Sequence, residues 1–140
     1  MGVFVAILVS LYAVLSALSL ATIWALRRRD VSQSLGVEIS LPVRAMLLSY
    51  APGAALAAWI ASVGMASAAA ALVWLKSAAA PLVFAAAVAL DLVLYFAWRD
   101  RGRYLAALTS AERLGEALQS LLVLCALFGL AWLNHRGALG

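Results

Sequence analysis

Four long apolar runs dominate the chain, and short charged segments separate them. Each run is nearly free of charge over about 20 residues, the length that a helix needs to cross the ~30 Å hydrocarbon core of a bilayer. The runs are too long for strands and lack the charged face of a soluble surface helix. The pattern predicts an all-α integral membrane four-helix bundle, residues 1–140 forming a single membrane domain with spans at about 3–26, 53–75, 78–98 and 113–133.

Two prolines set the start of the second span. Pro42 suits the first turn of a helix, where its missing N–H costs nothing. A helix running unbroken from Pro42 to the end of the second span would be about 50 Å long, well beyond the hydrocarbon core. Pro52 removes a helical hydrogen bond and clashes with the preceding turn, and Gly53 follows it. We therefore expect a break at 50–53, after a short interfacial helix at 43–50.

The fourth helix carries its own start signal. Thr109 and Glu112 match the S/T-x-x-E capping box, in which each side chain satisfies a backbone N–H at the start of a helix. The sequence predicts that this helix begins near Ser110, before its apolar run.

Basic residues give the orientation. Eight of the ten fall in the first and third connections: Arg27, Arg28, Arg29, Arg44, Arg99, Arg101, Arg103 and Arg113. Cytoplasmic loops carry an excess of Lys and Arg, so we expect both chain ends outside, an N-out/C-out topology. The arginine clusters Arg27, Arg28, Arg29 and Arg99, Arg101, Arg103 are also candidate contacts for anionic lipid or for a partner protein.

Composition agrees with the membrane assignment. The chain is 67% hydrophobic and 11% charged, whereas a soluble domain has about 25% charged residues. The net charge of +4 does not indicate nucleic-acid binding, because topology explains the arginines at the ends of apolar runs. We expect a multi-pass protein of a bacterial cytoplasmic (inner) membrane, with the lipid bilayer and other membrane subunits as partners.

Asp91 is the one charge in the interior of a predicted span, since Arg113 and Glu116 lie at the start of the fourth, and burying it in lipid costs roughly 2.5–3.5 kcal/mol. It should therefore face protein or water. Tyr95 shares its helix face, and Ser16 and Ser19 on the first span are candidate partners for an intramembrane polar contact. Three interpretations stay open: a hydrogen bond within the bundle, a contact to a partner subunit, or an ion or substrate site.

Catalytic chemistry has no candidate residues here. His135 is the only histidine and Cys125 the only cysteine, so two-histidine haem ligation and an intrachain disulfide are excluded. No Gly-rich phosphate loop or nucleophile–base set is visible, and we expect no enzyme activity, no catalytic residue, no metal and no cofactor.

Small residues recur every four positions on the first two spans and allow close helix packing. They line stripes at Ala13, Ala17, Ala21, at Gly53, Ala57, Ala61, and at Ala54, Ala58, Ser62, Ala66, Ala70. Together with the missing chemistry, they favour a non-catalytic accessory or structural subunit of a larger membrane protein complex. The alternative is a small homo-oligomeric transporter or channel that uses Asp91, with an unknown substrate.

Overall fold

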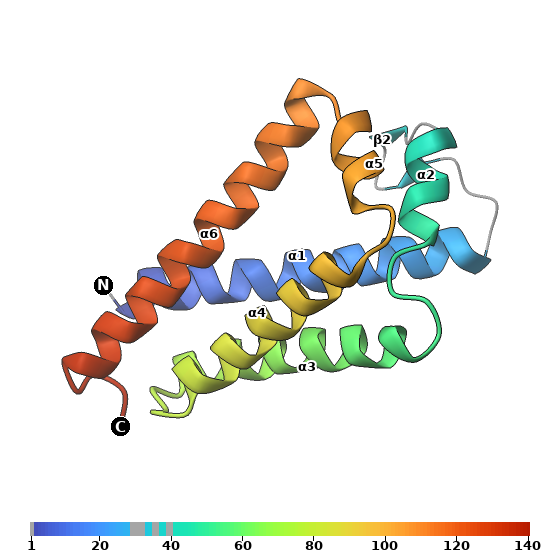
Figure 1. Ribbon diagram of the computed structural model, residues 1–140. Helices are drawn as coiled ribbons and strands as arrows, with labels where there is room; N and C mark the ends of the chain where they lie inside the picture. Colours follow the sequence, from blue (N-terminus) through green and yellow to red (C-terminus); the bar gives the residue numbers. More distant parts are fainter. Residues whose placement is uncertain (1, 29–32, 35–36, 39–40) are drawn as a thin grey trace.

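Four helices long and apolar enough to cross a membrane make up most of the chain (Figure 1). The structure, a computed structural model, describes residues 2–28, 33–34, 37–38 and 41–140. The long helices are α1 (Gly2–Arg28), α3 (Ala54–Trp74), α4 (Ala80–Ala97) and α6 (Ser110–His135). Between them lie the short helices α2 (Leu41–Leu48) and α5 (Arg101–Ala107), and an antiparallel pair of two-residue strands, β1 (Gln33–Ser34) and β2 (Val37–Glu38). The chain is thus a multi-pass membrane protein of helical architecture.

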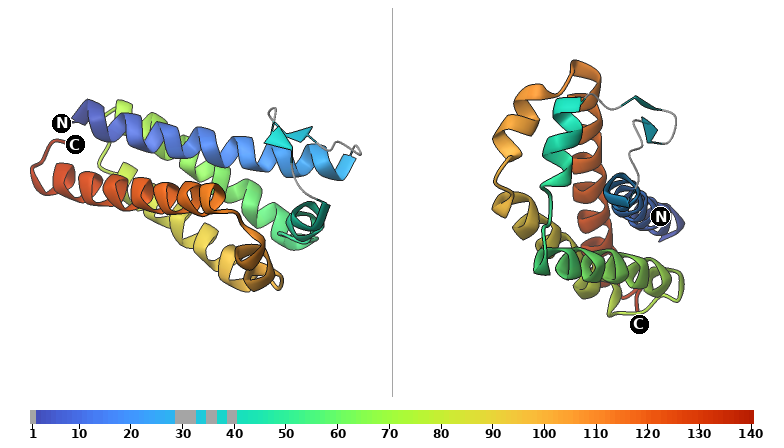
Figure 2. Two further views of the ribbon diagram at one scale, coloured as in Figure 1. Left: turned by 90° about the horizontal axis from the view of Figure 1, so that it is seen from above. Right: turned by 90° about the vertical axis from the view of Figure 1, so that its right-hand side faces the viewer.

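The two chain ends lie together at one end of the molecule (Figure 2). The backbone N–H of Gly140 donates to the carbonyl oxygen of Lys76 over 2.8 Å, which joins the C-terminus to the link between α3 and α4. Helices α2 and α5 contact each other at the opposite end. Hence the structure has a terminal end, with both termini, and an arginine end, with α2 and α5.

The break before the second long helix is confirmed. Helix α2 ends at Leu48 and α3 begins at Ala54, and the intervening turn holds Ala51 at φ 47° and Gly53 at φ 56°. Pro52 between them cannot continue a helix, as expected from its missing donor and its ring. Arg27 of α1 closes the turn: its Nη2 atom donates to the carbonyl oxygens of Tyr50 (2.6 Å) and Ala51 (3.2 Å).

The start of α6 is also confirmed. Thr109 Oγ1 accepts from the Glu112 backbone N–H, and the Glu112 carboxylate accepts from the Thr109 N–H at 2.7 Å, the predicted capping box. Helix α5 was not expected, because the charges in 99–109 indicated a connection. In the structure no residue of α5 is fully buried, and Leu105 is exposed, but Leu108, which follows the helix, is buried.

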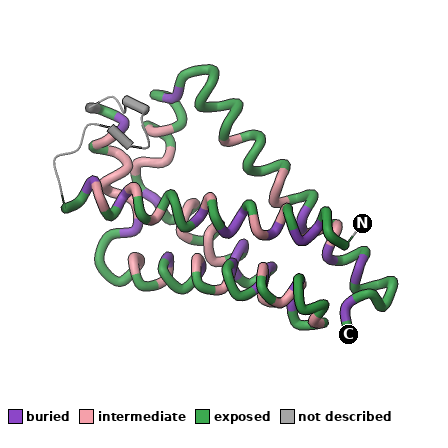
Figure 3. Tube along the Cα trace, turned by 180° about the vertical axis from the view of Figure 1, so that it is seen from behind, coloured by how far each residue is buried: buried purple, intermediate pink, exposed green. Residues whose placement is uncertain are grey.

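Helices α1, α3 and α4 form the packed part of the molecule. Small side chains let α3 and α4 approach closely, and Ala66, Ala69 and Ala87 are fully buried between helices. Phe84 fills the remaining space at 0% exposure, with the Tyr12 ring edge-on to it at 5.3 Å. The buried positions follow the facing sides of these helices (Figure 3).

Helix α6 joins this core over part of its length. It meets α1 and α4 near the terminal end and diverges from α4 toward the arginine end, where α5 connects the two helices (Figures 1 and 2). The contact with α1 depends on Gly129, because a Cβ atom there would lie 2.6 Å from Cγ2 of Val5. The diverging half is largely exposed, and an exposed face carries Leu114, Leu118, Leu121 and Leu124.

Candidate functional site

Asp91 lies in the middle of α4 and accepts two hydrogen bonds from other helices. Its Oδ2 atom accepts from the hydroxyl of Tyr12 on α1, and its Oδ1 atom accepts from the hydroxyl of Ser62 on α3. Ser62 also lies 3.2 Å from the carbonyl oxygen of Ala87, one turn before Asp91. Tyr12 and Ser62 are buried, at 3% and 0% exposure. The carboxylate thus joins three membrane-length helices in one polar contact.

These three residues meet because they lie at matching heights. Tyr12 is 10 positions after Gly2, Asp91 is 11 after Ala80, and Ser62 is 12 before Trp74. At 1.5 Å per residue, the three positions agree within about 3 Å along their helices, measured from the terminal end. The small side chains around Ser62 then bring α3 close enough to α4 for the hydroxyl to reach the carboxylate.

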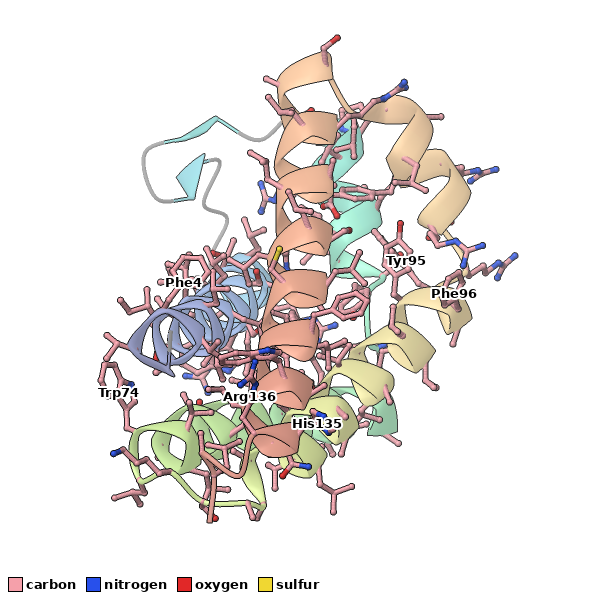
Figure 4. All side chains as sticks on the ribbon, turned by 90° about the vertical axis from the view of Figure 1, so that its left-hand side faces the viewer. Phe4, Trp74, Tyr95, Phe96, His135 and Arg136 are labelled. Carbon is pink, nitrogen blue, oxygen red and sulfur yellow. The ribbon has the colours of Figure 1, made fainter. Side chains whose placement is uncertain are left out.

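The other candidate residues occupy different places. Ser16 is buried one turn after Tyr12, with its hydroxyl near that of Tyr12. Ser19 is exposed and bonds to the Leu15 carbonyl of its own helix at 2.9 Å. Tyr95 lies at the end of α4, its ring 5.7 Å from that of Phe96 (Figure 4). The structure thus brings Asp91 together with Tyr12 and Ser62, and it places Ser19 and Tyr95 elsewhere.

An aromatic cluster, Tyr50, Trp59, Trp98 and Tyr104, joins four elements near the arginine end. Tyr50 packs edge-on against Trp59 (4.8 Å) and Trp98 (5.3 Å), and Tyr104 lies 4.9 Å from Trp98. The Trp98 indole N–H donates to Ser49 Oγ at 2.9 Å. These contacts hold the turn at 50–53 and α5 against the helix ends.

Tyr104 connects α5 to α6. Its hydroxyl donates to Glu116 Oε1 at 3.2 Å. Burial, followed by the nearby Glu116 carboxylate, raises the pKa of Tyr104 above its ordinary value, because both disfavour the phenolate. Tyr104 therefore stays protonated at neutral pH and keeps its proton for this bond.

The candidate arginines divide into separate groups. Arg27 binds the turn carbonyls described above, and the Arg28 guanidinium lies 4.0 Å from the centre of the Trp24 ring. Arg29 lies outside the described residues. Arg99 and Arg103 line an open concavity of about 600 Å³ with Asp100 and Gly102, at the junction of α4 and α5.

Arg101 lies beside this concavity on aromatic rings. Its guanidinium carbon is 4.7 Å from the Phe96 ring centre and 5.6 Å from that of Tyr95. Its Nη1 atom is buried and has no hydrogen-bond partner within the described part of the chain. A buried guanidinium N–H usually has an acceptor, so this atom is an exception within the described residues.

Neither the described residues nor the comparisons with known proteins indicate a metal site or a family. Across residues 2–28, 33–34, 37–38 and 41–140, no group of three or more His, Cys, Asp or Glu side chains is placed to hold a metal ion. Comparisons with protein-family models, curated proteins and solved structures find no match to this chain.

Proposed function

We propose that this protein is a non-catalytic subunit of a larger membrane protein complex, in a bacterial cytoplasmic membrane, and that a partner helix packs on α3. The observation that carries the proposal is the outer face of α3. Five small residues share it, all exposed: Ala57, Ala61, Gly64, Ala68 and Ala71. Lipid chains gain little from such a surface, whereas a second helix can approach its backbone closely.

Helix α6 adds support of a different kind. Buried residues make up 11% of its membrane-length window, against 22–33% in the other three long helices. Its diverging half presents exposed leucines along one face, which a further protein neighbour can cover. Both helices thus leave surfaces that other subunits can cover.

The polar contact at Asp91 fits the same role. Both hydroxyls that reach the carboxylate come from helices packed within this chain, so the contact stabilises the subunit itself. The alternative, a small homo-oligomeric transporter or channel that uses Asp91, rests on the presence of a carboxylate at mid-height among hydroxyl groups. Such a protein would assemble from copies of this chain alone.

Native purification in mild detergent, followed by mass spectrometry, separates the two proposals. We expect a defined set of other membrane proteins to copurify with the chain. A Gly64→Leu variant should lose them, because the leucine blocks close approach to α3, while open space around Gly64 lets the chain itself fold. Ala86→Leu, which enlarges an exposed alanine on α4, is the matched control and should keep them.

Two outcomes would overturn the subunit proposal. A stable, pure monomer from the native membrane would contradict the proposal, because no other subunit would be bound to the chain. A homo-oligomer without other proteins would favour the transporter, and Asp91 would then be the residue to replace in flux measurements.

A further inference from the structure

The junction of α4 and α5 combines an excess of positive charge with an exposed apolar strip on α4 that leads to it. Residues 99–103 carry three arginines and one aspartate, so the segment has a net charge of +2. Arg99, Asp100 and Arg103 line the open concavity, and Arg101, whose side chain is partly exposed, lies between them in the sequence. The site therefore offers several N–H donors to one anion.

An exposed apolar strip on α4 leads to this junction. Val93 is 63% exposed and Phe96 is 66% exposed, and Leu92 beside them is half exposed. Figure 4 shows Phe96 at the end of α4, and the Arg101 guanidinium stacks on this ring. Because α4 is long and apolar enough to span a membrane, the strip is suited to acyl chains, and the arginines follow it where headgroups would begin.

We propose that this junction binds an anionic phospholipid, with the phosphate held by Arg99, Arg101 and Arg103 and an acyl chain along Val93 and Phe96. An arginine fork matches phosphate oxygens with parallel N–H donors. Asp100 lines the same concavity and disfavours a dianion, so one singly charged headgroup, as in phosphatidylglycerol, fits best. This site does not depend on the subunit role proposed above.

Native mass spectrometry of the detergent-solubilised protein, titrated with phosphatidylglycerol or phosphatidylcholine, tests the site. Each basic residue near a membrane surface contributes about 1 kcal/mol to binding an anionic lipid, which is about fivefold in affinity. We expect tighter binding of phosphatidylglycerol than of phosphatidylcholine, and about a fivefold loss for Arg103→Gln, whose side chain is exposed. Arg101→Gln should lose at least as much.

Arg136→Gln supplies the matched control. Arg136 also stacks on a ring, 5.2 Å from the centre of Trp132, but at the terminal end of the molecule. Its replacement should leave phosphatidylglycerol binding unchanged. Equal affinity for both lipids, or an equal loss in Arg103→Gln and Arg136→Gln, would overturn the proposal. Displacement of the lipid by inorganic phosphate at similar concentration would also overturn it, because the site would then be one for free phosphate.

Discussion

At the scale of single residues, Asp91 shows how one carboxylate is accommodated inside an apolar chain. A charged or polar group among hydrocarbon needs hydrogen bonds, because water is absent there. Two hydroxyls from two different helices supply them, so the cost of placing Asp91 at mid-height is offset by contacts that also set how α1, α3 and α4 meet. The carboxylate therefore contributes to the specificity of packing.

A double-mutant cycle tests this contact. Hydrogen bonds between membrane helices contribute about 0.6 kcal/mol on average and about 1.7 kcal/mol at most. Tyr12→Phe should lower the free energy of unfolding by an amount in this range, and it should cost almost nothing once Asp91→Ala has removed the acceptor. Unfolding in mixed micelles provides the measurement.

Tyr95→Phe is the control for this cycle, since Tyr95 lies on the same helix but outside the polar contact. Its effect should be the same with and without Asp91. If Tyr12→Phe costs the same in both backgrounds, the hydrogen bond between Tyr12 and Asp91 does not contribute to stability.

At the scale of elements, local signals predicted helix boundaries well, and contacts between helices less well. Pro52 and the Thr109–Glu112 capping box act on their own backbone, so the sequence showed where α3 and α6 begin. The partners of Asp91 depend on relative height and rotation. The position of a residue along its helix axis can be read from the sequence: Ser19 is 17 positions after Gly2, about 10 Å further along α1 than Tyr12. The rotation of each helix about its own axis cannot be read from the sequence, because it depends on close packing around Ser62.

Helix α5 was missed for a related reason. Its seven residues are too few to show a clear amphipathic period, and a helix of this length is marginal on its own. Contacts stabilise it: Tyr104 packs on Trp98 and bonds to Glu116, and Arg101 stacks on the end of α4. Such tertiary support leaves little trace in a local sequence pattern.

The contact between α1 and α6 is the element-scale feature most open to a test. A methyl group at position 129 would meet the stiff, β-branched Val5, so Gly129→Ala should destabilise the protein by about 1–3 kcal/mol, the usual cost of overpacking. Unfolding in mixed micelles measures the change. Adding Val5→Ala removes the clashing atoms and should recover part of the loss.

Gly115→Ala is the matched control in the same helix. Nothing lies within 4 Å of a Cβ atom there, and alanine favours a helix over glycine by about 1 kcal/mol. This variant should be neutral or slightly more stable. A neutral Gly129→Ala would mean that α6 does not approach α1 as closely as the structure shows.

At the scale of the whole molecule, charge and chain direction agree. Both termini and the link at Lys76 lie at one end, while Arg99, Arg101 and Arg103 lie at the other with α2 and α5. This separation is what four crossings of a membrane would produce. The excess of basic residues at the arginine end is the basis on which the sequence predicts an N-out/C-out topology, and that orientation stays a prediction.

Cysteine labelling tests that topology in right-side-out membrane vesicles. The starting variant is Cys125→Ala, which removes the only native thiol. Two exposed positions then receive single cysteines, Ala138→Cys at the terminal end and Gly102→Cys at the arginine end. A membrane-impermeant maleimide should label position 138 in intact vesicles, and position 102 only after permeabilisation. The reverse result would invert the topology, and labelling of both positions in intact vesicles would contradict an arrangement in which the two ends lie on opposite sides of the membrane.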